Sequence, residues 1–221
     1  MKYGELSPNS NINANIYRCL KVIRVEDQQK FVKKIQTGAI KDDQMSHLYR
    51  ELLVGAYLQS KNMNVRYDQR ILLKTPDWSI YDNSDKLIGI VEVTSINMDL
   101  KTMNYIDNQL SNNMTASYWR DGTKDNPRRL YQSIENKTTK YKEIINSLNI
   151  FFIVSVFISF KMNFHEDEIE EILYNKQSGI FIQYNHLSGV LIYYDSNDIY
   201  NFKYYVNKYS NNQIEVENGS M

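Results

Sequence analysis

Two carboxylates, Asp77 and Glu92, flank a stretch whose pattern is typical of two strands joined by a tight polar turn. Residues 82–85 (Asp-Asn-Ser-Asp) supply the turn, and the apolar, β-branched run 87–94 follows it. If the hairpin folds about the bond between residues 84 and 85, Asp77 lies opposite Glu92, with their Cβ atoms roughly 5 Å apart. Carboxylates this close repel each other unless a cation separates them, and such hard oxygen ligands suit Mg²⁺ or Mn²⁺. The pair therefore predicts a divalent-metal site.

The two carboxylates differ in how strongly their surroundings indicate a function. Glu92 lies among Ile90, Val91 and Val93 in a run that favours a buried strand. Since a buried carboxylate needs a partner or a metal, the pattern favours a functional Glu92. Asp77 is equally well interpreted as a residue of a strand edge or a turn.

The same residues carry a family resemblance. Pro76-Asp77, a variable turn and Glu92-Val93-Thr94 resemble the signature of the PD-(D/E)XK nuclease superfamily, an Asp followed by an acidic-x-Lys on adjacent strands. Thr94 stands where the signature has its lysine. The resemblance covers residues 44–159 and implies a restriction-endonuclease-like fold, an α/β/α sandwich with a central mixed β-sheet. It also implies that Asp77, Glu92 and the Val93 carbonyl hold Mg²⁺ or Mn²⁺ for the hydrolysis of phosphodiester bonds.

The resemblance also implies a role for an acidic residue before the hairpin. In this superfamily a helix at that place often supplies a carboxylate that contacts metal-bound water, and Glu51 is similar in position. Glu51 lies on the edge of an apolar helical stripe that includes Leu48 and Leu52. A solvated helix residue paired with Arg50 or Lys61 is an equally good interpretation.

A lysine missing from the signature strand is often replaced, in this superfamily, by one on the following helix. Lys137 fits that role, with Lys140 second. Lys137 occupies the step between Ile134 and Tyr141 on an apolar stripe. A lysine on a core-facing stripe is unusual unless its stem lies along the surface or its charge meets a carboxylate.

Basic and aromatic residues before and at the start of that helix suggest contacts with nucleic acid. Arginine and lysine contact phosphates, and aromatic rings stack on bases. The candidates are Arg120, Lys124, Arg128 and Arg129, together with Tyr118 and Trp119. A solvated basic helix face accounts better for Arg128 and Arg129. The three histidines, His47 among them, are interpreted as surface or turn residues.

The elements that must position these residues follow in a clear order. Helices are predicted over 16–35 (broken near Val25), from 42 or 43 to 60, over 128–148 and over 165–174, with a helical piece over 100–112 in a long loop. Besides the hairpin, strands are predicted over 65–74, 150–160, 179–184, 187–194 and 202–206. The uninterrupted apolar run 150–160 is typical of a central strand buried on both faces. The order indicates an α/β sandwich with a mixed sheet and helices on both faces.

Length and composition bound the class of protein. The 221 residues predict one domain, 1–221, with loose ends at 1–15 and 211–221. Apolar and charged fractions of 42% and 24% are those of an ordinary globular protein, and no apolar run is long enough to span a membrane. With one cysteine, zero formal net charge and no signal-peptide pattern, we expect a cytoplasmic protein whose nucleic-acid binding depends on a local basic patch.

Together these observations predict a Mg²⁺-dependent nuclease that acts on DNA. The resemblance to the superfamily implies a restriction or anti-invader setting. Two alternatives stay open. Thr94 at the lysine position and the neutral net charge favour a catalytically inactive nuclease-like fold that binds nucleic acid or protein. An unrelated α/β interaction domain, with Asp77 and Glu92 incidental, is the other. A homodimer is compatible with all three.

Overall fold

The computed structural model describes residues 3–37, 42–97, 104–105, 108–109, 111–112, 125–159, 162, 164–196 and 199–221. Its centre is one seven-stranded sheet whose strands lie side by side in chain order. They are β1 (Asn64–Tyr67), β2 (Trp78–Tyr81), β3 (Leu87–Ile96), β4 (Phe151–Ile158), β5 (Gly189–Ser196), β6 (Ile199–Val206) and β7 (Gly219–Ser220). Strands β3, β4 and β5 run parallel, and the other neighbours pair antiparallel. The chain is therefore a mixed α/β protein.

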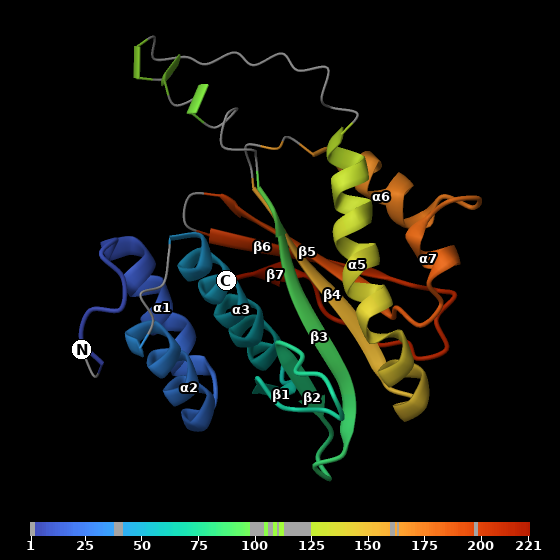
Figure 1. The fold of residues 1–221 in the computed structure, drawn as a ribbon, viewed down its shortest axis with the longest axis horizontal. Helices are drawn as coiled ribbons and strands as arrows, with labels where there is room; N and C mark the ends of the chain where they lie inside the picture. The colour runs from blue at the N-terminus through green and yellow to red at the C-terminus, as the bar shows by residue number, and fades with distance from the viewer. Residues whose placement is uncertain are drawn as a thin grey trace.

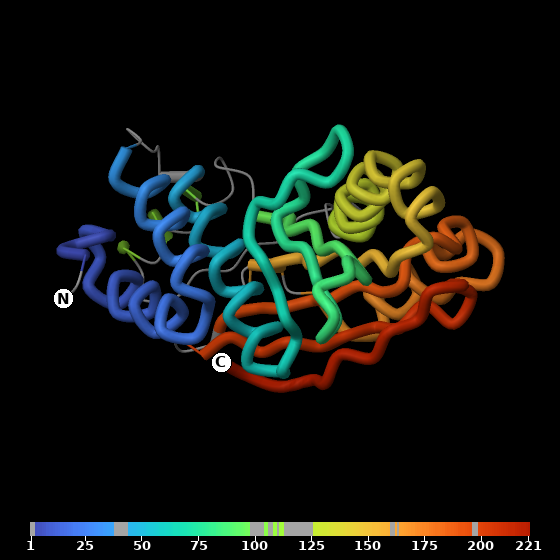
Figure 2. Tube along the Cα trace, turned by 90° about the horizontal axis from the view of Figure 1, so that it is seen from below, coloured from blue at the N-terminus to red at the C-terminus, as the bar shows by residue number. Residues whose placement is uncertain are grey.

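Helices cover the curled sheet on both faces (Figures 1 and 2). On one side lie α1 (Ser10–Val22), α2 (Val25–Thr37) and α3 (Asp42–Ser60), and on the other α5 (Asp125–Leu148), α6 (Glu166–Tyr174) and α7 (Ile180–Gln183). Each set packs in its own cluster of buried apolar side chains. The expected break near Val25 is confirmed, since α1 ends before α2 begins there. Of the described helices, none is long and apolar enough to cross a membrane.

The β2–β3 hairpin has the register that its sequence predicts. Trp78 pairs with Val91 and Ser79 with Ile90, and the pairing shifts by one residue only beyond Ile80, near the turn. The Asp82 carboxylate accepts the amide hydrogens of the turn, from Ser84 at 2.8 Å and Lys86 at 2.9 Å. Continued by one residue, the register brings Asp77 to the level of Glu92.

Strand β4 lies in the interior of the sheet, between β3 and β5. All eight of its residues are buried, which explains the unbroken apolar run in the sequence. In the parallel β3–β4 pair Glu92 lies beside Val154. The carboxylate of Glu92 therefore projects from a strand whose neighbours offer apolar surroundings.

Trp78 fixes α3 against the sheet. Its indole is completely buried and lies against Gly55, where an added Cβ would come within 1.8 Å of the ring carbon Cζ2. The indole Nε1 donates a hydrogen bond of 2.8 Å to the backbone carbonyl of Glu51. Only a glycine at position 55 allows this close approach, and the approach sets the position of Glu51.

Some expectations are wrong. The predicted strand 179–184 is instead the short helix α7 (Ile180–Gln183), with Ile180 and Phe181 buried. The predicted strand 65–74 ends early, because β1 stops at Tyr67. The described parts of the expected loose ends are packed: Leu6 is buried before α1, and β7 pairs with β6 near the C-terminus. The predicted helical piece 100–112 lies mostly outside the described residues.

Candidate active site

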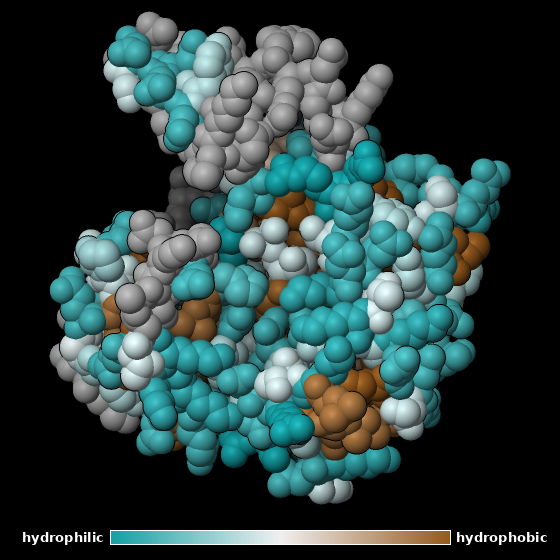
Figure 3. Space-filling model, in the orientation of Figure 1, coloured by the Kyte–Doolittle hydropathy of each residue, from teal (hydrophilic) through white to brown (hydrophobic). Residues whose placement is uncertain are grey.

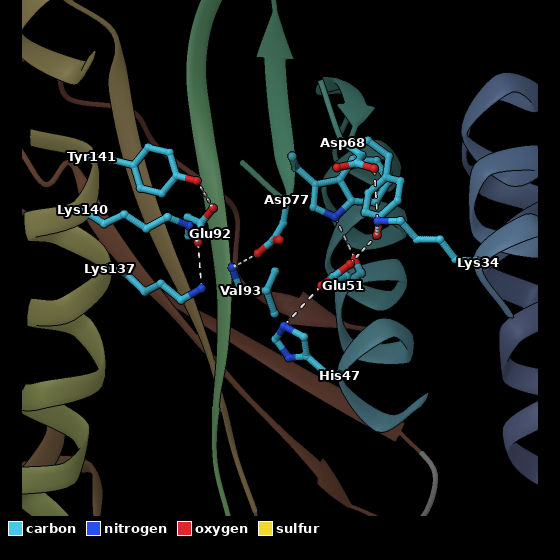
Figure 4. A network of polar contacts seen from close by, with 12 residues as sticks. Lys34, His47, Glu51, Asp68, Asp77, Glu92, Val93, Lys137, Lys140 and Tyr141 are labelled. Atoms are coloured by element: carbon cyan, nitrogen blue, oxygen red, sulfur yellow. Dashed lines mark hydrogen bonds and ion pairs between the residues drawn. The ribbon is translucent and has the colours of Figure 1, made fainter. Parts of the chain in front are cut away.

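Glu92 is the centre of a polar network that joins β3 to α5 (Figure 4). Its side chain is only 1% exposed. Oε2 accepts from the Lys137 ammonium at 2.7 Å and lies 3.5 Å from that of Lys140, while Oε1 accepts from the Tyr141 hydroxyl at 2.5 Å. A buried carboxylate is stable only with such partners. Helix α5 thus brings two ammonium groups and a hydroxyl group to the Glu92 carboxylate.

Asp77 lies directly before β2, and part of its surface remains exposed. Its Oδ2 accepts the backbone amide hydrogen of Val93 at 2.7 Å. Burial, together with the negative charges of Glu92 and Glu51, raises the pKa of Asp77 from 3.8 to about 8. The Asp77 carboxyl therefore keeps its proton to a higher pH than a free aspartate, and a cation placed beside it would oppose that shift.

Glu51 reaches the same region from α3. The carboxylate accepts a hydrogen bond from the Tyr67 hydroxyl, and its other oxygen lies 3.2 Å from Nε2 of His47. Burial raises the pKa of Glu51, and the Tyr67 hydrogen bond and the positive charge of Lys34 oppose this shift. Figure 4 shows Asp77 between Glu92 and Glu51, so residues of α3, β3 and α5 meet at the beginning of β2.

Lys137 binds Glu92, and the negative charges of Asp77 and Glu51 also act on it. Burial opposes the charged form of Lys137, but Glu92, and to a lesser extent Asp77 and Glu51, hold its pKa above the usual value. The structure therefore places Lys137 beside the predicted pair. Lys140, which ideal helix geometry turns away from the stripe, also reaches Glu92, with its side chain 42% exposed against 25% for Lys137.

His47 and Tyr141 belong to the network but are not among the residues that the sequence predicts for the site, and neither is Tyr67, the hydrogen-bond donor to Glu51. His47, expected at the surface, is half-buried beside Glu51, and burial and the charges of Lys137 and Arg50 lower its pKa, which favours the neutral ring. Its position four residues before Glu51, one helical turn away, was a usable signal. The sequence pattern shows Tyr141 only as a residue of the apolar stripe, because the pattern does not reveal which group its hydroxyl will contact.

The candidate nucleic-acid residues are only partly described. Arg128 is exposed at the start of α5, and Arg129 donates to the backbone carbonyl of Asn97 at 2.6 Å. Arg50 of α3 donates to the side chain of the same asparagine at 3.1 Å. The end of β3 is thus held from both helices. Arg120, Lys124, Tyr118 and Trp119 lie outside the described residues.

The donors available to a metal ion are oxygen atoms. Within the described ranges, no three acidic, histidine or cysteine side chains gather closely enough to hold an ion by themselves. A divalent ion would take its protein ligands from Asp77, Glu92 and the Val93 carbonyl, with water completing the shell. Mg²⁺ commonly binds through one or two carboxylates and keeps several waters, so the donor set fits that ion.

No protein-family model, no curated protein and no solved structure matches this chain. The function is therefore inferred from the arrangement of these side chains.

Proposed function

We propose that the protein is a metal-dependent nuclease of the PD-(D/E)XK type that hydrolyses phosphodiester bonds in DNA. One observation carries the proposal: Lys137 on α5 lies 2.7 Å from Glu92, where the negative charges of Asp77 and Glu51 also act on it. Two carboxylates at the start of a hairpin, a third from the preceding helix and a lysine from the following helix are the parts that phosphodiester hydrolysis needs. The helix–hairpin–helix–strand order of the chain supports the restriction-endonuclease-like fold in the proposal.

Each residue has a distinct task in this mechanism. Asp77, Glu92 and the Val93 carbonyl would hold Mg²⁺ or Mn²⁺, which supplies Lewis acidity at the phosphate and lowers the pKa of water. Lys137 offsets the negative charge that develops on the phosphate oxygens. Glu51, whose carboxylate lies 3.2 Å from Nε2 of His47, orients the attacking water. Tyr141 holds the Glu92 carboxylate in one orientation.

A catalytically inactive, nuclease-like binding module is the second candidate. It is favoured by the pairing of Glu92, whose oxygens already have Lys137, Lys140 and Tyr141 as partners. In that case the network would serve stability and the surface around it would bind nucleic acid without cutting it. The restriction or anti-invader setting is proposed by analogy with the superfamily. A cytoplasmic location and a homodimer are proposed with it.

The deciding experiment is single-turnover cleavage of labelled duplex DNA in Mg²⁺ and in Mn²⁺. We expect the parent protein to cleave and the Glu92→Gln variant to lose cleavage by on the order of 100-fold or more, because one metal ligand loses its charge. Glu143→Gln is the matched control, since Glu143 is an exposed carboxylate of α5. Cleavage by Glu92→Gln at the parent rate would refute the mechanism, and a parent that binds DNA without cutting it would support the binding module.

A further inference from the structure

The loop between β1 and β2, residues 68–77, presents two leucines to solvent. Leu72 is 58% exposed and Leu73 is 86% exposed. Leu72 has φ 51°, in the left-handed region that residues with a side chain rarely adopt. The loop stands out beside α5 in Figure 2, and Figure 3 shows a hydrophobic patch where the loop crosses the front of the molecule. Two leucines on a protruding, strained turn call for an apolar partner.

The loop is held in one shape. Ile71 and Lys74 exchange two backbone hydrogen bonds, of 2.8 and 3.0 Å, which close the turn under the two leucines. The Ile71 side chain is buried in the cluster on the α5 face, and Arg70 Nε donates to the Leu72 carbonyl at 3.2 Å. The turn is therefore a rigid projection rather than a loose apolar segment.

The same loop is tied to the candidate active site. Its first and last residues are joined, since the Asp68 amide donates to the Asp77 carbonyl at 3.1 Å. The Tyr141 hydroxyl, which binds Glu92, also lies 3.3 Å from the Thr75 carbonyl. The loop is therefore attached to the candidate active site at Asp77 and, through Tyr141, next to Glu92.

The charges next to the leucines indicate the chemistry of that partner. Arg70 and Lys74 flank the two leucines and are both exposed. An apolar tip between two cations is complementary to duplex DNA, whose phosphates border a groove of stacked bases. Proteins that kink DNA insert side chains such as leucine between base pairs from the minor groove, with basic residues on the backbone.

We propose that Leu72 and Leu73 form a wedge that enters the minor groove of duplex DNA and unstacks a base step next to the bond to be cut. Arg70 and Lys74 contact the phosphates on either side. The inference rests on the proposed function for the choice of DNA as substrate, and it adds how the substrate is gripped and deformed. DNA deformation of this kind makes recognition depend on how easily a base step opens.

The test measures DNA binding and DNA distortion in Ca²⁺, separately from cleavage. A labelled duplex gives the affinity across a salt series, and duplexes carrying 2-aminopurine at successive positions report unstacking. We expect the parent to raise 2-aminopurine fluorescence at one step. Leu72→Ala with Leu73→Ala should abolish the rise and weaken binding roughly tenfold at every salt concentration, because apolar contact is lost while counterion release is not.

Two controls isolate the wedge. Arg70→Ala with Lys74→Ala should flatten the plot of log affinity against log salt by about 0.9 per lost phosphate contact. Ile182→Ala should change nothing, since Ile182 is an exposed apolar residue of α7, on the other side of α5 from the loop. Since Leu72 and Leu73 are exposed, the double variant keeps its core, and circular dichroism checks its fold.

The outcomes separate this inference from the proposed function. If the leucine variant binds and unstacks DNA like the parent, or if the parent binds no duplex DNA, the wedge is wrong. If the parent binds and unstacks DNA through the leucines but does not cleave it, the wedge holds and the nuclease proposal fails. If cleavage depends on Glu92 while no base step opens, the nuclease proposal holds and the wedge fails.

Discussion

The ammonium group of Lys137 lies 2.7 Å from Oε2 of Glu92, which links the middle of α5 to β3. On β3 itself, the residue two places after Glu92 is Thr94, which carries no charge. The positive charge next to the carboxylates therefore comes from the helix that follows the hairpin. This relationship makes α5 part of the candidate site as well as a cover for the sheet.

The two lysines that reach Glu92 should differ in their importance. We expect Lys137→Ala to slow single-turnover cleavage by on the order of 100-fold or more, because a charge contact to the transition state is lost. Lys140→Ala should be milder, since its ammonium lies 3.5 Å away and is more exposed. Lys142→Ala, a change of an exposed lysine on the same helix, is the control. Full activity of Lys137→Ala would remove this lysine from the mechanism.

Metal binding should depend on the charge of Glu92. We expect calorimetric titration to show weak Mn²⁺ binding to the parent and none to Glu92→Gln, because a divalent ion stabilises paired anionic ligands. Lys137→Met should bind Mn²⁺ more tightly, since the lysine competes with the ion for Oε2. Glu143→Gln should behave like the parent. Unchanged Mn²⁺ binding by Glu92→Gln would place the metal elsewhere.

The pKa of Asp77 predicts a pH dependence of stability in the metal-free protein. Its folded-state pKa of about 8 lies above the ordinary 3.8, so the native state retains a proton that the unfolded chain has lost. The contribution of Asp77 to the free energy of unfolding therefore decreases as pH rises from 3.8 to about 8. Asp77→Asn removes this term, so the variant should gain stability relative to the parent over that range.

Urea unfolding in EDTA at a series of pH values checks this. The difference in free energy of unfolding between Asp77→Asn and the parent should grow with pH and level off above about 8. Glu143→Gln, a change of an exposed carboxylate on α5, is the control variant. A difference that stays constant with pH would mean that Asp77 titrates normally.

The contact between Gly55 and Trp78 should be essential for stability. Gly55→Ala places a Cβ within 1.8 Å of the buried indole, so we expect a loss of about 1–3 kcal/mol or more. Urea unfolding measures the loss. The double variant Gly55→Ala, Trp78→Phe should be more stable than Gly55→Ala alone, because the smaller ring makes room. Parent-like stability of Gly55→Ala would contradict the packing described.

The exposed arginine at the start of α5 should contribute to DNA binding through phosphates. We expect Arg128→Glu to weaken binding and to flatten its salt dependence by about 0.9 or more in the slope of log affinity against log salt. Arg128→Glu with Arg129→Glu should have a larger effect, which includes the loss of the contact to Asn97. Lys142→Glu is the matched control on α5. An unchanged slope for both arginine variants would show that these residues are merely solvated.

Local patterns predicted the parts of the site that depend on neighbouring residues in sequence. The turn chemistry around Asp82 was enough to give the pairing of Trp78 with Val91, because a hairpin closes on itself. Lys137 occupies the step between Ile134 and Tyr141 on the apolar stripe of α5. Because helical spacing decides which residues face the sheet, this position predicted that Lys137 lies near the carboxylates. The unbroken apolar run that forms β4 predicted a strand in the centre of the sheet, because a strand that is buried on both faces is apolar at successive positions.

Features that depend on distant contacts were not predictable in this way. Residues 179–184 have the composition of a strand but form α7, because a short apolar run does not distinguish a strand from a buried helical turn. The exposure of Leu72 and Leu73 follows from the path of a loop between two strands. The spacing of four residues between His47 and Glu51 indicates that they are neighbours on one helix. The burial of His47, however, depends on the packing of α3 against the sheet.

The spatial order of the strands repeats their order along the chain, and this has a consequence for synthesis on the ribosome. The polar network described around Glu92 and Glu51 draws on residues from Lys34 to Tyr141, so all of its residues precede β4 and β5 in the chain. Until β5 arrives, however, β4 has an unpaired edge along a strand with all its residues buried in the finished fold. Such an edge is a template for pairing with another chain. The nascent chain is therefore most prone to aggregate between the emergence of β4 and that of β5, while this strand edge is unpaired.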